Sequence, residues 1–154
     1  KGPKGEVEKE FRHPMIKLVQ EGNKIILRVV KGTKREKTVI GSFAAHVRNM
    51  IKGVGELHVY HLKVCSSHFP MAVSAAGNEF IVKNFLGESV ARRVKLIKGV
   101  EIKVEGVDIA VSSAHKEGAG QMAARIENLC RITNRDIRIF QDGIYIVNKA
   151  GKEM

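Results

Sequence analysis

Short apolar runs of alternating pattern occupy the first thirty residues of the chain. Val7 and Phe11 alternate with glutamates, and Met15 to Val19 and Ile25 to Val30 are rich in β-branched residues. Such runs, separated by turn residues such as Glu21-Gly22, are typical of strands. Because they follow one another so closely, the pattern predicts an antiparallel meander of three strands.

The pattern then changes from strand to helix period. Apolar residues recur at three- and four-residue spacing from Ile40 to Ile51, which predicts an amphipathic helix after a basic loop at Lys31 to Lys37. Gly53 stands where a helix C-cap glycine is expected. A second stripe, Met122 to Cys130, predicts a second helix.

Between and after these helices the chain returns to strand-like runs. They are Leu57 to Val64, Glu79 to Lys83, Val90 to Ile97, Val100 to Val104, Val107 to Val111 and Ile144 to Val147. Each is bounded by Gly, Asn, Pro or Asp, the residues that favour turns.

The two halves repeat one order of elements. Each runs through strands, a Glu-Gly turn (Glu21-Gly22 and Glu105-Gly106), a further strand, a loop and a helix. This predicts an α+β fold of two tandem similar domains, each an antiparallel sheet packed against one helix; the alternative is chance recurrence of short turns. We expect a first domain at 1–53, a second at 54–133 and a C-terminal tail at 134–154.

Charge narrows the possible partners. The chain has 27 Lys and Arg against 16 Asp and Glu, a net charge of +11 and a pI near 9.9. This balance favours a polyanion, and nucleic acid above all. No long basic amphipathic helix and no apolar run of about eighteen residues is visible, so a membrane is not the expected partner.

The basic residues form two clusters. Lys24 to Lys52 contains eight against Glu36, and Lys83 to Lys98 contains five against Glu88. In the second cluster Gly87 allows backbone to approach a phosphate. Arg92 and Arg93 point to opposite faces if that run is extended.

A third basic group lies near the C-terminus. Arg131, Arg135 and Arg138 would share one face of a helix. The aromatic residue Phe140 and an Asp142-Gly143 turn signal follow, and guanidinium groups beside an aromatic ring suit phosphates and an unstacked base. The alternative is a terminal helix and turn with ordinary surface arginines.

Other chemistry is poorly supported by the pattern. His61 and Cys65, four apart on a strand, would lie about 13 Å apart and could not share a metal ion. Ser67 and His68 are neighbours only in sequence, without a nucleophile-elbow motif. The two cysteines, Cys65 and Cys130, are expected to be free. We therefore expect no metal, no cofactor and no enzyme activity.

Four segments resemble one protein family. R-x-x-R-x-F-x-D-G-I-Y-x-x-x-K from Arg135 to Lys149 is similar to the C-terminal motif of ribosomal protein L6 in its archaeal and eukaryotic form, with Asn128 where that motif has an upstream Gln. AHVRNMIKGV, HFPMAV and NFLGESVARRVKL, starting at Ala45, His68 and Asn84, resemble family segments in the family's order. The start, Lys1 to Phe11, resembles an interior segment, so a strand or two of that family is expected to be absent here.

The resemblance implies a cytoplasmic, ribosomal protein without catalysis of its own. It implies binding to large-subunit rRNA near the sarcin–ricin loop and the docking area of translational GTPases, beside neighbouring large-subunit proteins. The second domain and the C-terminal tail are expected to carry most of the contact. The expected rRNA-binding residues are Lys83, Asn84, Phe85, Gly87, Arg92, Arg93, Lys95, Arg135, Arg138, Phe140 and Tyr145. A basic module that binds other RNA or an acidic protein outside the ribosome is the second hypothesis, and an RNA-processing enzyme the last.

Overall fold

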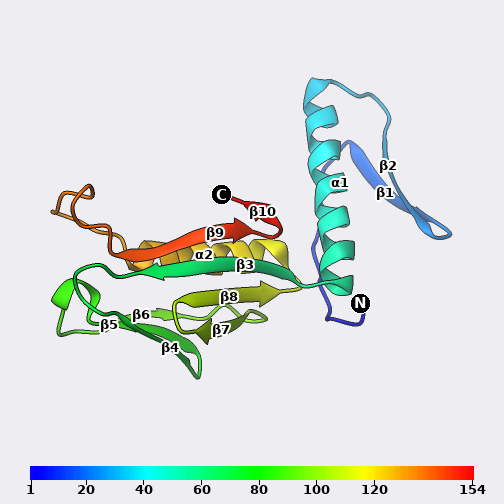
Figure 1. Ribbon diagram of the computed structural model, residues 1–154. Coiled ribbons are helices and arrows are strands. Elements are labelled where there is room, and N and C mark those ends of the chain that lie inside the picture. Colours follow the sequence, from blue (N-terminus) through cyan, green and yellow to red (C-terminus); the bar gives the residue numbers. More distant parts are fainter.

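The chain folds into two parts joined at one corner. The structure, a computed structural model, describes all residues from Lys1 to Met154. It contains two α-helices and three antiparallel sheets, which confirms the predicted α+β class (Figure 1). Neither helix is long and apolar enough to cross a bilayer.

The first part consists of a hairpin and one helix. Strands β1 (Ile16–Glu21) and β2 (Lys24–Val29) pair antiparallel, and α1 (Lys34–Gly55) follows. The third predicted strand, at Val7 to Phe11, is wrong, because these residues pair with no strand. The ring of Phe11 instead lies 5.0 Å from that of Phe43 on α1, so its apolar character reflects packing against the helix.

Helix α1 starts earlier and ends later than the apolar stripe. Thr33 caps its N-terminus and Glu36 completes a capping box, so the helix takes up half of the predicted basic loop. The helix continues to Gly55, and Gly53 lies inside it. Gly53 is therefore not a C-cap, and its role is found at the junction described below.

The second part is larger. Its five-stranded sheet has the order β10-β9-β3-β8-β7. The strands of this sheet are β3 (His58–Cys65), β7 (Glu101–Glu105), β8 (Asp108–Ser113), β9 (Gly143–Lys149) and β10 (Lys152–Glu153). Strands β4 (Ala72–Ala76), β5 (Glu79–Lys83) and β6 (Arg92–Lys95) form a separate three-stranded sheet. Helix α2 (Lys116–Leu129) packs against β3, β8 and β9 of the larger sheet and against β6 of the smaller one.

The C-terminal residues are part of the larger sheet. Strand β9 pairs with β3 along the register from Tyr60–Lys149 to Cys65–Gly143. Residues 134–154 are therefore not the separate tail that the sequence suggested. Their apolar residues Ile144 and Ile146 pack into or against the core, and this burial holds β9 beside a strand that is distant in sequence.

A hairpin followed by a helix occurs in both parts. The β1–β2 and β7–β8 hairpins turn at Gly22 and Gly106, with φ of 60° and 62°, and lead into α1 and α2 respectively. A residue with a side chain is strained at such φ values, so both turns favour glycine. The repeated order seen in the sequence is thus a repeated structural unit, although the first part has fewer strands.

The buried core lies almost wholly in the second part. One cluster of fifteen buried residues runs from Tyr60 to Ile144 and includes Phe80 and Met122. In the first part Ile16 is the one large apolar side chain that is buried. The position of the first part therefore depends strongly on its contacts with the second.

Those contacts are close and mostly polar. Gly53 packs against the backbone of Ala114 so tightly that an added Cβ would lie 2.0 Å from the carbonyl oxygen. Beside it, the buried His58 places Nε2 2.9 Å from the backbone oxygen of Asn49 on α1.

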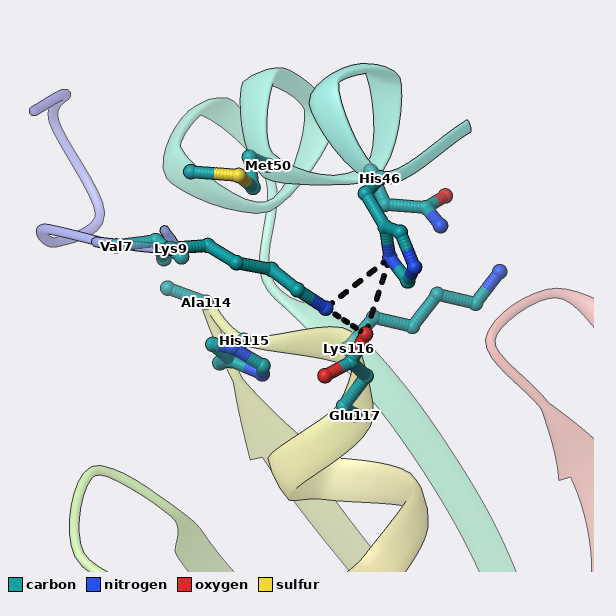
Figure 2. Close-up of a pocket in the computed structure, with 9 residues that line it drawn as sticks. Val7, Lys9, His46, Met50, Ala114, His115, Lys116 and Glu117 are labelled. Carbon is teal, nitrogen blue, oxygen red and sulfur yellow. Dashed lines mark hydrogen bonds and ion pairs between the residues drawn. The ribbon is translucent and has the colours of Figure 1, made fainter. Parts of the chain in front are cut away.

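Figure 2 shows a charged cluster at the same junction. Lys9 from the N-terminal segment pairs with Glu117 at the start of α2, and His46 Nδ1 of α1 lies 3.0 Å from Glu117 Oε1. Three elements from both parts thus meet at one carboxylate.

Candidate nucleic-acid interface

Three loops gather at the end of the second part that lies farthest from α1 (Figure 1). They span residues 66–71, 84–91 and 130–142. Asn84 Nδ2 donates a hydrogen bond to the Pro70 oxygen at 3.0 Å, which joins the first two loops. Ser67 N–H and Oγ–H donate to Asp142 Oδ1, which joins the first and third. Most of the residues predicted to bind RNA lie in these loops or on the strands beside them.

The loop at 84–91 is tight and carries unusual backbone. Asn84, Leu86 and Gly87 have φ of 59°, 50° and 79°, and Phe85–Gly87 form a single 3₁₀ turn. Asn84, Gly87 and the preceding Lys83 are exposed. The loop therefore presents side-chain donors and accessible backbone to a phosphate.

Two residues predicted at this loop face inward instead. Phe85 is 1% exposed and belongs to the core, so its ring cannot stack on a nucleotide. The Arg92 guanidinium lies 4.3 Å from the centre of that ring, forms two hydrogen bonds with Glu88 and donates to the Leu129 oxygen at 2.7 Å. Arg92 therefore holds the loop against α2, and these contacts leave its guanidinium less available to a phosphate than the sequence suggested.

The alternation predicted at Arg92 and Arg93 is confirmed. Arg92 pairs with the buried Val82 on the inner side, whereas Arg93 lies on the exposed face with a 4.0 Å approach to Glu79. Lys95 is also exposed but lies opposite Glu79, at the end of β5 away from Lys83. The structure therefore brings Arg93 closer than Lys95 to the three loops.

The C-terminal arginines do not share a helical face. Residues 131–142 form an extended loop with one turn, in which Phe140 N–H donates to the Asp136 oxygen at 2.9 Å. Asp136 also accepts from the backbone and guanidinium of Arg138, the latter at 2.7 Å. These bonds, and Asn134 at φ 60°, replace the helix that the spacing predicted, because Asp and Asn satisfy backbone groups in turns.

The arginines of this loop differ in how free they are. Arg138 is highly exposed, but its guanidinium is paired with Asp136, and this pair holds the pKa of the Asp136 carboxyl below its usual value. Arg135 has no carboxylate partner and lies over the ring of Phe140 at 4.8 Å. Arg135 is therefore the better placed of the two to bind a phosphate.

Phe140 and Tyr145 border one groove. Its lining comes from the end of α2, the C-terminal loop and β9: Glu127, Asn128, Cys130, Arg131, Ile132, Ile137, Phe140, Ile144 and Tyr145. The Tyr145 ring covers Gly143, where an added Cβ would lie 3.2 Å from the ring, and its hydroxyl donates to the Gln141 oxygen at 3.1 Å. Burial raises the pKa of Tyr145, so the hydroxyl stays neutral.

Beneath this surface lies a buried carboxylate. Asp142 is 1% exposed and accepts at Oδ1 from Ser67 N–H at 2.5 Å and from Ser67 Oγ at 2.6 Å. Burial acts to raise the pKa of Asp142, but the hydrogen bonds from Ser67 and His68 outweigh it, and the pKa lies below its usual value. Asp142 thus fixes the loop at 66–71 rather than a hairpin turn.

His68 also belongs to this surface, although it is not among the predicted rRNA-binding residues. Its ring lies 5.0 Å from that of Phe140, and its Nδ1 lies 3.4 Å from Asp142 Oδ2. Asp142 is more than seventy residues away along the chain, so no local spacing connected the two. The available signal was the H-F-P segment itself, which stood out by its resemblance.

The structure brings no three His, Cys, Asp or Glu side chains into an arrangement that could hold an ion. Cys65 is exposed and Cys130 is buried, and both are free thiols.

Comparison with known proteins gives a consistent result. The family model for "Ribosomal protein L6" matches residues 1–56 and 69–143. Proteins named large ribosomal subunit protein uL6 are similar over nearly the whole chain. The protein of Methanocella arvoryzae is 42% identical over 151 residues, which cover 97% of this chain and 85% of the relative. The protein of Methanococcus vannielii is 43% identical, with 95% and 80% covered, and that of Nanoarchaeum equitans is 45% identical, with 99% and 84% covered.

Proposed function

Because this chain belongs to the ribosomal protein L6 family, we propose that it is a structural constituent of the large ribosomal subunit that binds large-subunit rRNA, mainly through residues 54–154. Its place is then the cytoplasmic ribosome, among neighbouring large-subunit proteins, and it has no reaction of its own to catalyse. The observation that carries the RNA-binding part is the gathering of three loops at one end of the second part (Figure 1), where the exposed Lys83 and Arg135 form no ion pair.

The number of basic residues alone would favour the first part of the chain as the RNA-binding part. The cluster from Lys24 to Lys52 is richer in basic residues, but it surrounds the start of α1 in the part that has almost no core. The three loops are instead fixed by hydrogen bonds that join them to one another and by the core beneath them. Donors on rigid elements lose less conformational entropy on binding, which favours the second part.

Among the predicted contacts, the structure supports some more than others. Lys83, Arg93 and Arg135 are exposed and lie at or near the three loops. Asn84 and Gly87 present donors and backbone, and Phe140 and Tyr145 present ring surface in the groove. Arg138 would have to give up Asp136 or share it, so we propose that it contributes less than Arg135.

Two variants of the full chain, each lacking two positive charges, test which part of the chain binds rRNA. Arg93→Gln with Arg135→Gln removes two charges from the proposed interface. Arg35→Gln with Lys37→Gln removes two exposed charges from the start of α1. Because a charged hydrogen bond contributes about 1.5–3 kcal/mol, the first variant should bind in vitro transcribed large-subunit rRNA at least tenfold more weakly, and the second should change little. Equal decreases in affinity would show that net charge, rather than these loops, determines binding.

Salt dependence gives a second measure of the same interface. Each neutralised phosphate contributes about −0.7 to −0.9 to the slope of log K against log salt, so the wild-type slope should be about −3 or steeper. In the interface variant the slope should become shallower by about 1 for each phosphate that the protein no longer neutralises. A flat wild-type profile would favour the alternative of an acidic-protein partner outside the ribosome.

We further propose that the three-loop end lies near the sarcin–ricin loop and the docking area of translational GTPases. The support is the resemblance of the Asn84 to Leu96 and Arg135 to Lys149 segments to the family. Cys65, exposed at the end of β3, allows a hydroxyl-radical probe to be attached there, since Cys130 is buried. In reconstituted large subunits, rRNA cleavage should centre on the sarcin–ricin region. Cleavage confined to distant helices would refute this placement.

A further inference from the structure

His68 is held on one side by buried groups and is open on the other. Its side chain is 38% exposed, and the inner ring nitrogen, Nδ1, lies 3.0 Å from Ser67 Oγ and 3.4 Å from Asp142 Oδ2. Asp142 Oδ2 is the single buried side-chain oxygen in the protein that lacks a hydrogen bond. A buried carboxylate oxygen without a donor is costly, and the nearby imidazole is the group that can supply one.

The arrangement is not that of a catalytic triad. In a triad the carboxylate and the hydroxyl contact different ring nitrogens, whereas here Ser67 and Asp142 both approach Nδ1. The outer nitrogen, Nε2, forms no hydrogen bond with the protein. His68 therefore cannot relay a proton between these partners, but it can donate outward from Nε2.

The outward side of His68 adjoins the proposed RNA surface. The imidazole packs against Phe140 at 5.0 Å between ring centres, and the Arg135 guanidinium lies against the same ring at 4.8 Å. Two donors thus border one aromatic side chain. Such a grouping suits the phosphate of an RNA strand whose base is unstacked.

We propose that His68 is a proton-dependent phosphate contact beside Arg135, with Nε2–H donating to RNA, and that Asp142 is the positioning residue that holds the cationic imidazole through Nδ1. This inference rests on the proposed rRNA-binding function and deepens it. It predicts that RNA binding takes up a proton, so affinity falls as the pH rises from about 6 to 8.

The charged groups around the His68 imidazole are consistent with tighter RNA binding at lower pH. Asp142 faces it from the buried side, and its pKa lies below the usual value because of the hydrogen bonds from Ser67 and His68, so it stays anionic. Arg135 lies beyond the Phe140 ring, and the Tyr145 hydroxyl lies near Asp142 and the Cys65 thiol. Arg135 opposes protonation of His68, while Asp142 and an incoming phosphate favour it.

The test measures binding of the full-length protein to in vitro transcribed large-subunit rRNA between about pH 6 and 8 at constant salt. Wild type should bind about tenfold more tightly at the low end. His68→Gln should bind like wild type at high pH and lose the pH dependence. The matched control is His61→Gln on β3, an exposed histidine outside the three loops, which should keep it. A pH profile that is the same in His68→Gln and wild type would overturn the proposal.

A second variant separates positioning from mere structural support. Asp142→Asn keeps an acceptor for Ser67 but removes the negative charge, and it should flatten the pH profile of RNA binding. A pH profile that stays as steep as that of wild type would refute the role given to Asp142. Failure of wild type to bind rRNA at any pH would overturn the proposed function as well, whereas pH-independent binding would overturn only the present inference.

Discussion

The contact between Gly53 and Ala114 determines how the two parts of the chain meet, and a single methyl group tests it. In Gly53→Ala the new Cβ would lie 2.0 Å from the Ala114 oxygen, 3.0 Å from the carbonyl carbon and 3.1 Å from His58 Cδ2. Since contacts of a Cβ below 3.0 Å are essentially never seen, the backbones must separate by about 1 Å. The obstacle is backbone, so rotation of a side chain cannot relieve it.

The expected cost follows from two opposing effects. Overpacking of this kind typically costs about 1–3 kcal/mol, while Ala in place of Gly inside a helix returns about 1 kcal/mol. Because the clash here is severe, we expect a net loss of about 2 kcal/mol, or a decrease in Tm of about 4–8 °C for a chain of this size.

Gly41 in the same helix provides the control. Nothing lies within 4 Å of a Cβ at that position, so Gly41→Ala should show only the gain in helix propensity, about 1 kcal/mol. Urea unfolding followed by circular dichroism measures both variants. The free energy of unfolding should decrease in Gly53→Ala and increase in Gly41→Ala. If both variants are equally stabilised, α1 does not rest on Ala114 as described.

Three further predictions concern the second part. Arg92→Met should lower the free energy of unfolding by about 1–3 kcal/mol, because it removes the links to Glu88 and to the Leu129 oxygen, while the exposed Arg93→Met should change it by less than about 0.5 kcal/mol in the same urea titration. Iodoacetamide should modify Cys65 in the folded protein but spare Cys130, whose pKa burial raises to about 11; mass spectrometry that finds both labelled equally would contradict this. Asp142→Asn should cost about 1–2 kcal/mol near neutral pH, and the difference from wild type should shrink as the pH falls below about 4, because a carboxyl with a lowered pKa loses its contribution on protonation; a constant difference would argue against an ionised Asp142.

The elements themselves were largely predictable from local pattern. The apolar stripe of α1, the β7–β8 hairpin and the strand beginning at Gly143 all depend on period and turn residues close together in sequence. Two of the failures have identifiable causes. The alternation at Val7 to Phe11 arises from packing against α1. In the C-terminal loop the arginine spacing predicted a helix, but the side chain of Asp136 accepts a backbone hydrogen bond and Asn134 has a positive φ, and both features favour turns.

The binding residues were harder to predict, because exposure is decided by the whole fold. Phe85 and Arg92 have the composition of an RNA contact, yet both face the core, since β6 presents Arg92 toward α2. Arg135 and Arg138 look equivalent in the sequence, and only the neighbouring Asp136 distinguishes them.

The sequence by itself determined the positive net charge, the α+β class and the family, since these depend on composition, periodicity and motifs that can be read along the chain. The tertiary structure alone decided which basic groups are free and which are already paired. It also decided that His68, Phe140 and Asp142 meet, because contacts between residues so far apart in the chain follow from the pairing of β9 with β3. Strand pairing over that distance is fixed by burial of Ile144 against the shared core, and no local pattern encodes it.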